Sequence, residues 1–186
     1  MKTTLSILLA AGCCWLAGGR IARAGDAQAT NLAPVRIGVY DSRALAYAWF
    51  WTEAHQRQLK ELMQAARAAK AEGQTNRWQQ LEATLRQHQD DVHRECFSTA
   101  PAPEALAAIQ NRIPEIQKEA DVIMLVSQWD EEKLRQYPNA EKVEMTDRLV
   151  QEFQPTEEQR KVIADLRKRN PLPLEKCNEL IRQGKI

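Results

Sequence analysis

The side chains best suited to bind a soft metal ion lie on two predicted helices that face each other. They are His55, His88, His93 and Cys96. His93 and Cys96 would share a helix face, and a turn near residue 74 would place His55 opposite residue 93. Such a cluster can bind a metal, but the spacing is not that of a zinc site, and no third group completes a Cys–His nucleophile. We therefore expect no metal and no catalytic residue here, only side chains of a helix seam or surface.

Other catalytic and nucleotide-binding patterns are missing from the sequence. Four of the seven glycines precede residue 26, and only Gly38, Gly73 and Gly184 follow. A glycine-rich phosphate loop, a dinucleotide fingerprint and a nucleophile elbow all need more glycines at closer spacing. We therefore expect a protein that is not an enzyme and that binds no cofactor.

The first 24 residues have the pattern of a secretory signal peptide. Lys2 precedes the apolar run LSILLAAGCCWLAGG, and Ala22-Arg23-Ala24 is a small-x-small cleavage motif. We expect cleavage after Ala24 and export to the periplasm, with Ala27-Gln28-Ala29 as a second candidate cleavage site. The alternative is lipid attachment at Cys13, in AAGC, which would anchor the protein to a membrane.

The net charge of the mature chain argues against one class of partner, nucleic acid. Removal of residues 1–24 takes three basic and no acidic residues, and leaves 23 basic against 25 acidic residues, a net charge of −2. Binding to nucleic acid by phosphate neutralisation needs a basic surface, so we expect no nucleic-acid partner.

Two cysteines remain after removal of residues 1–24, Cys96 and Cys177. In an oxidising compartment they are a candidate disulfide, and two separate buried thiols are the alternative.

Three short strands are predicted, far apart in the sequence. They are residues 35–40 (VRIGVY), residues 122–126 (VIMLV) and residues 142–145 (KVEM). The second is a run of five apolar residues with polar flanks, which favours a strand covered on both faces. We expect a small sheet whose root, shared with other subunits, is built from Val35, Ile37, Val39, Val122, Met124 and Val126.

A long helical hairpin is predicted between the first two strands. From Asp41 the seam residues step by three and four for about thirty residues, as far as a C-terminal Gly73. A second seam runs from Trp78 to Val92, and Asn76 with Gln79 resembles a capping pair for that helix. Two seams joined by a tight turn are typical of an antiparallel coiled coil.

Prolines divide the remainder into shorter helices. Those in FSTAPAP (residues 97–103) end the hairpin, and Pro114 predicts a kink or a restart. Beyond the third strand, Thr146 is expected to cap one helix, and Thr156 with Gln159 forms a capping box for another. The fold class is therefore α+β and mainly α.

Two motifs and the order of elements resemble the OmpH/Skp family of periplasmic chaperones. RIGVYDSRAL (residues 36–45) is similar to the family pattern IGxVDxxRxL. KVEMTDRLVQEF (residues 142–153) is similar to VDITDxVLxxL, with five positions in register: Val143, Thr146, Asp147, Leu149 and Val150. The resemblance covers residues 35–153. Residues 25–34 are expected to form a flexible segment, and residues 154–186 a C-terminal helical extension.

The resemblance implies a trimer whose strands join into one barrel and whose hairpins surround an unfolded outer-membrane protein. We therefore expect an exported chaperone (holdase) with unfolded or envelope proteins as partners, and a membrane association only if Cys13 is lipidated. The alternative is a non-enzymatic envelope scaffold or adaptor, lipid-anchored, whose hairpin docks a folded partner.

Overall fold

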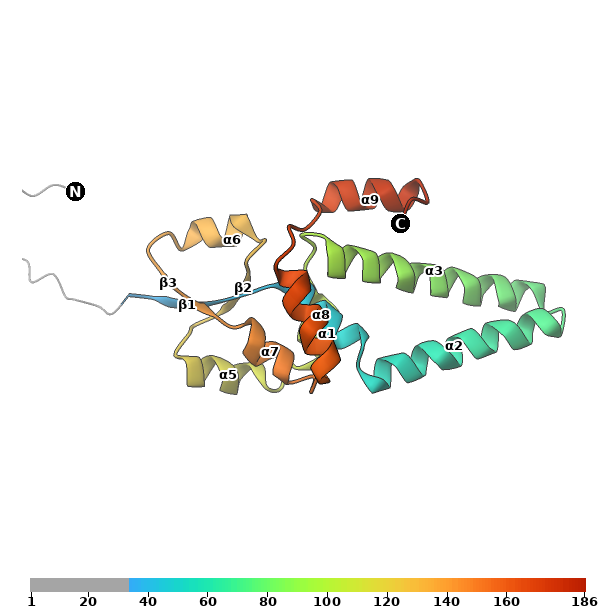
Figure 1. Cartoon of the computed structure of the whole chain (residues 1–186), viewed down its shortest axis with the longest axis horizontal. Helices are drawn as coiled ribbons and strands as arrows, with labels where there is room; N and C mark the ends of the chain where they lie inside the picture. Colours follow the sequence, from blue (N-terminus) through green and yellow to red (C-terminus); the bar gives the residue numbers. More distant parts are fainter. Residues whose placement is uncertain (1–33) are drawn as a thin grey trace, which may run out of the picture. The chain divides into compact units, whose positions relative to one another are not determined.

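Helices predominate in the protein and a small sheet joins them, so the α+β, mainly α class is confirmed (Figure 1). The structure is a computed structural model that describes residues 34–186. These residues lie in one compact unit, Ala33–Ile186, so the predicted 35–153 and 154–186 segments pack together. The predicted signal peptide, its cleavage sites and Cys13 lie outside the described residues.

The sheet has three parallel strands: β1 (Arg36–Tyr40), β2 (Leu125–Ser127) and β3 (Glu141–Glu144). Their order is β2-β1-β3, so the first strand of the sequence is the central one. Val39 pairs with Val126 on one side and with Glu144 on the other. The expectation that the first strand finds its partners far downstream is confirmed.

The second strand begins later than predicted. Residues 122–126 were expected to form it, but β2 starts at Leu125. The preceding helix ends at Asp121 in a left-handed conformation, with φ of 53°, so the next residues bring the chain to the sheet edge. They already bond to β1: the N–H of Ile123 donates to the Arg36 carbonyl at 3.0 Å.

The predicted single helix from Asp41 to Gly73 is wrong, because two helices occupy this stretch. Helix α1 (Ser42–Phe50) ends at Trp51, and α2 (Glu53–Ala71) begins after the N-cap Thr52. The Thr52 hydroxyl donates to the Trp49 carbonyl at 2.9 Å. Side chains on most sides of α1 are buried, whereas α2 buries only two alanines. The break therefore separates a helix of the core from a helix of the surface.

Helix α3 (Thr75–Phe97) follows α2 after a short turn, and the two lie side by side (Figure 1). The expected turn glycine is confirmed, because Gly73 has a left-handed φ of 70°. The expected Asn76–Gln79 capping pair is wrong. The helix begins two residues earlier than that pair requires, with Gln74 as an N-cap that makes no side-chain capping bond.

The return path contains the short helices that its prolines predict. Helix α4 (Pro103–Ala108) starts on a proline, and α5 (Ile113–Ala120) carries Pro114 in its first turn, so the helix restarts there. Helix α6 (Glu131–Gln136), between β2 and β3, was not predicted. Its local signal is Asp130, whose carboxylate accepts from the Lys133 N–H at 3.0 Å.

Three helices complete the chain: α7 (Thr146–Gln151), α8 (Glu157–Arg167) and α9 (Leu174–Arg182). The capping box of Thr156 and Gln159 is confirmed. The expected capping by Thr146 is wrong, because Met145 is the N-cap and the Thr146 hydroxyl instead accepts from the Asp41 N–H at 2.9 Å. Helix α8 packs on α1, and α9 packs on α3.

Candidate functional site

The residues predicted to form the sheet root lie at the sheet but differ in exposure. Ile37, Val122 and Val126 are buried, and Val39 and Met124 are half-buried. Val35 is 48% exposed, and the neighbouring Ile123, which the sequence interpretation did not single out, is 64% exposed. Two β-branched side chains are therefore open to solvent at the start of the sheet.

A buried polar cluster follows the carboxyl end of β1. The Asp41 carboxylate pairs with the Arg43 guanidinium at 2.8 Å, and both side chains are almost fully buried. Trp129 donates its indole N–H to Asp41 at 3.1 Å, and the Arg43 guanidinium lies over the Trp129 ring. Arg43 also donates to the Arg169 carbonyl at 2.8 Å. Each guanidinium nitrogen of Arg43 and both carboxylate oxygens of Asp41 make hydrogen bonds, so the cluster joins distant segments of the chain.

The best candidate for a binding site is an apolar groove between α2 and α3, where both helices meet the end of α1. Its volume is about 450 Å³, and its lining is mainly apolar: Phe50, Trp51, Gln56, Leu59, Met63, Leu85, His88, Gln89 and Val92. Ligand pockets commonly have volumes of about 300–1,000 Å³. Met63 is 40% exposed at the groove. Methionine adapts its shape to varied partners, which suits binding without sequence specificity.

Contacts at the break between α1 and α2 position two residues of the groove lining, Phe50 and Trp51. The Gln56 side chain donates to the Phe50 carbonyl at 2.8 Å, so a backbone acceptor freed by the break is satisfied. The Trp51 ring stacks on Tyr47 with centroids 4.3 Å apart. The first contact holds the backbone at Phe50 and the second holds the Trp51 ring, so both groove residues are positioned before any ligand binds.

Two histidines meet beside the groove, and one of them, His88, is part of its lining. The rings of His55 on α2 and His88 on α3 have centroids 5.0 Å apart, and both contact the edge or face of Phe50. Burial lowers the pKa of His55 below 6.5, and the nearby His88 lowers it further. Burial also lowers the pKa of His88, although Asp91 and Glu104 act in the opposite direction. Both rings therefore favour the neutral state.

A carboxyl group with a raised pKa lies farther along α3. Burial raises the pKa of Glu95 to about 7, and the negative charges of Glu104 and Asp91 add to the effect. One of its carboxyl oxygens is buried and has no hydrogen-bond partner within residues 34–186. Sequence reasoning missed Glu95, since its environment depends on α4 packing near α3.

The structure separates the predicted soft-ligand cluster. His55 faces His88 rather than residue 93, while His93 packs near Phe97 on its own helix. The expected pairing is wrong because the register across the turn between α2 and α3 places His88, five residues before residue 93, next to His55. Across the described residues, no group of three or more His, Cys, Asp or Glu side chains is arranged to hold a metal ion.

Cys96 and Cys177 are two buried free thiols in the structure, which is the second of the two alternatives. The Cys177 thiol lies 3.6 Å from the His93 carbonyl, where α9 packs on α3. Burial raises the pKa of both thiols, which suppresses the reactive thiolate.

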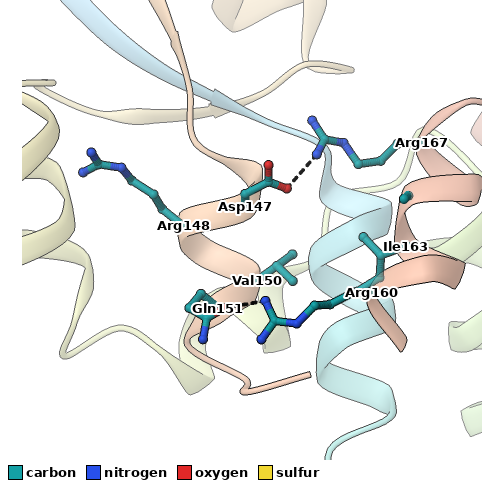
Figure 2. A pocket seen from close by; sticks show the side chains of 8 residues that line it. Asp147, Arg148, Val150, Gln151, Arg160, Ile163 and Arg167 are labelled. Atoms are coloured by element: carbon teal, nitrogen blue, oxygen red, sulfur yellow. Dashed lines mark hydrogen bonds and ion pairs between the residues drawn. The ribbon is translucent and has the colours of Figure 1, made fainter. Parts of the chain in front are cut away.

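A second cavity of about 520 Å³ lies between α7 and α8 (Figure 2). Three arginines line it, but two are already engaged. Arg167 pairs with Asp147 at 2.7 Å, and Arg160 donates to the Gln151 side chain at 2.7 Å. Figure 2 shows the third, Arg148, directed away from the other two. The cavity therefore offers no convergent charge to an anion.

Comparison with protein-family models, with curated proteins and with solved structures finds no match for this chain. In the part of the chain that the structure describes, no helix combines the length and the apolar composition needed to cross a membrane. The functional interpretation therefore depends on the groove and on the sequence motifs.

Proposed function

We propose that the protein is an exported, non-enzymatic holdase of the OmpH/Skp type. In this proposal α2 and α3 form a coiled-coil hairpin, and the groove at its base holds apolar segments of unfolded envelope proteins. The observation that carries the proposal is the apolar groove with an exposed methionine at its edge. Each large side chain that leaves water in such a groove contributes about 1.5–3 kcal/mol, which suits weak and reversible binding.

The test is suppression of aggregation of an unfolded outer-membrane protein by the wild type and two charge variants. Met63→Glu places a carboxylate in the groove and is expected to weaken suppression by about ten-fold or more, since a buried unpaired charge costs at least about 1.4 kcal/mol. Ala68→Glu adds the same charge at an exposed position of α2 outside the groove lining and is expected to keep full activity. No suppression by the wild type at molar excess would refute the holdase.

We also propose that the sheet is completed by other copies of the chain. In one chain both outer strands, β2 and β3, have a free edge among the described residues, and Val35 and Ile123 are exposed beside them. Closure by neighbouring subunits would cover both features. Light scattering is expected to give an oligomer, with a trimer as the family resemblance implies. A strict monomer at micromolar concentration would contradict this.

The identity of the mature N-terminus distinguishes an exported soluble protein from a lipid-anchored one. Mass spectrometry is expected to find a free amino terminus at Gly25, or at Thr30 if the second site is used. A lipid-modified Cys13 would instead favour the envelope scaffold or adaptor, and pull-downs with and without residues 53–96 would then identify its folded partner.

A further inference from the structure

One ionisable side chain, His88, lines the apolar groove, and it contacts a second one, His55. His55 comes from α2 and His88 from α3, with ring centroids 5.0 Å apart. Phe50 contacts both rings at 5.2 and 5.5 Å, and the Trp49 ring lies 5.3 Å from His55. The Nδ1 of His55 is buried without a hydrogen-bond partner among the described residues. Burial among these aromatic rings favours the neutral form of both imidazoles.

The charged groups that face the pair are few. Asp91, on α3, acts on His88, and Glu104, on α4, acts on both rings. Neither carboxylate makes an ion pair with a histidine in the part of the chain that the structure describes. Once both rings are protonated, two cations about 5 Å apart would therefore repel each other across the α2–α3 contact.

We propose that the His55–His88 pair is a pH-operated latch, which holds α2 against α3 while both rings are neutral and opens the groove when the rings take up protons. This regulation rests on the proposed holdase function. Acidification would widen the groove and expose more of its apolar lining.

Proton binding determines how the stability of the closed state changes with pH. The pKa of each ring is lower in the closed state than its ordinary 6.5, so the closed state binds fewer protons than an open, hydrated one. The closed state therefore loses stability as the pH falls through 6.5, and the loss is complete below the lowered pKa values. Glu95 acts in the opposite direction, because its pKa is raised to about 7 from 4.5.

The test measures the distance between α2 and α3 by pulsed electron paramagnetic resonance. Spin labels are attached at Gln64→Cys and Ala83→Cys, which are exposed positions on the two helices. Between about pH 8 and about pH 5, the mean distance in the full chain is expected to lengthen, and bis-ANS fluorescence is expected to rise severalfold. In the His55→Gln/His88→Gln double variant, both readouts are expected to stay at their pH 8 values. The matched control His93→Gln is expected to respond like the wild type.

A variant with a permanent positive charge at position 88 provides a second test. His88→Arg is expected to show the longer distance already at about pH 8. An unchanged distance in the wild type, or an equal lengthening in the double variant, would overturn the latch. Global unfolding, followed by circular dichroism, would overturn it too if it accounted for the change. Failure of the holdase itself would be seen separately, as loss of aggregation suppression at about pH 8 in every variant.

Discussion

At the residue scale, Asp41 connects more of the protein than any local pattern indicates. Its carboxylate accepts from the Arg43 N–H at 3.0 Å and so caps α1, while it also binds the Arg43 side chain and the Trp129 indole. Arg43 extends the connection to the carbonyl of Arg169. One ion pair thus links the end of β1, the start of α6 and the segment beyond α8. A buried pair with all its hydrogen bonds made is costly to break, because the surviving partner is left as an unpaired charge.

We expect Asp41→Ala to lower the free energy of unfolding by about 3–5 kcal/mol, since it leaves the Arg43 charge buried and unpaired. Urea denaturation monitored by tryptophan fluorescence measures this loss. The control Asp147→Ala removes an exposed partner of Arg167 and is expected to cost less than about 1 kcal/mol. Equal losses in the two variants would mean that the Asp41 cluster is not a structural centre.

Glu95 makes stability depend on pH near neutrality. Its pKa is raised to about 7 in the folded state from 4.5, so the folded protein binds the extra proton, and stability falls as the pH rises from 4.5 to 7. Glu95→Gln removes this penalty. It is expected to stabilise the protein on the order of 1–2 kcal/mol above pH 7 and to bring little gain below pH 4.5. Thermal melts at both ends of this range test it, and an equal gain at both would contradict the assignment.

At the scale of elements, the small sheet depends on a close approach at the middle of β1. A Cβ added to Gly38 would lie 2.7 Å from side-chain atoms of both Leu125 and Met145. Glycine at this position lets the side chains of Leu125 and Met145 lie directly against the central strand. The groove depends on another local feature, the break at Trp51 and Thr52, which turns the surface helix α2 away from the buried α1.

Gly38→Ala is therefore expected to destabilise the protein by about 1–3 kcal/mol through overpacking. Gly73→Ala is the comparison, because a Cβ added there would meet no described atom within 4 Å and only the φ of 70° opposes the substitution. Its cost is expected to be about 1 kcal/mol. Chemical denaturation of both variants decides the matter, and a smaller loss for Gly38→Ala than for Gly73→Ala would rule out the close packing.

At the scale of the whole described unit, the C-terminal segment belongs to the core. Ile163 of α8 packs with Ala44 and Ala48 of α1 in a buried cluster. The return from α8 to α9 is bonded to the end of α3, where the Leu172 N–H donates to the Phe97 carbonyl at 2.9 Å. The hairpin base is therefore supported by residues far beyond the family-like segment.

Deletion of residues 155–186 is expected to abolish a cooperative thermal transition, since it uncovers the buried face of α1 and the contacts of α3. Deletion of residues 184–186, all of which are exposed, is the control and is expected to leave the melting temperature unchanged. Differential scanning calorimetry compares the two. A cooperative transition in the longer deletion would establish residues 35–153 as an independent domain.

The sequence by itself determined the features that depend on a few neighbouring residues. The turn at Gly73, the proline-started helices and the capping box of Thr156 and Gln159 follow from local backbone geometry and hydrogen bonding, and all are present. Only the tertiary structure decided which distant groups meet. The strand order, the contact of Asp41 with Trp129 and the pairing of His55 with His88 join residues that are far apart in the chain. Periodicity cannot specify such pairs, because it tells which face of an element is apolar and not which other element covers that face.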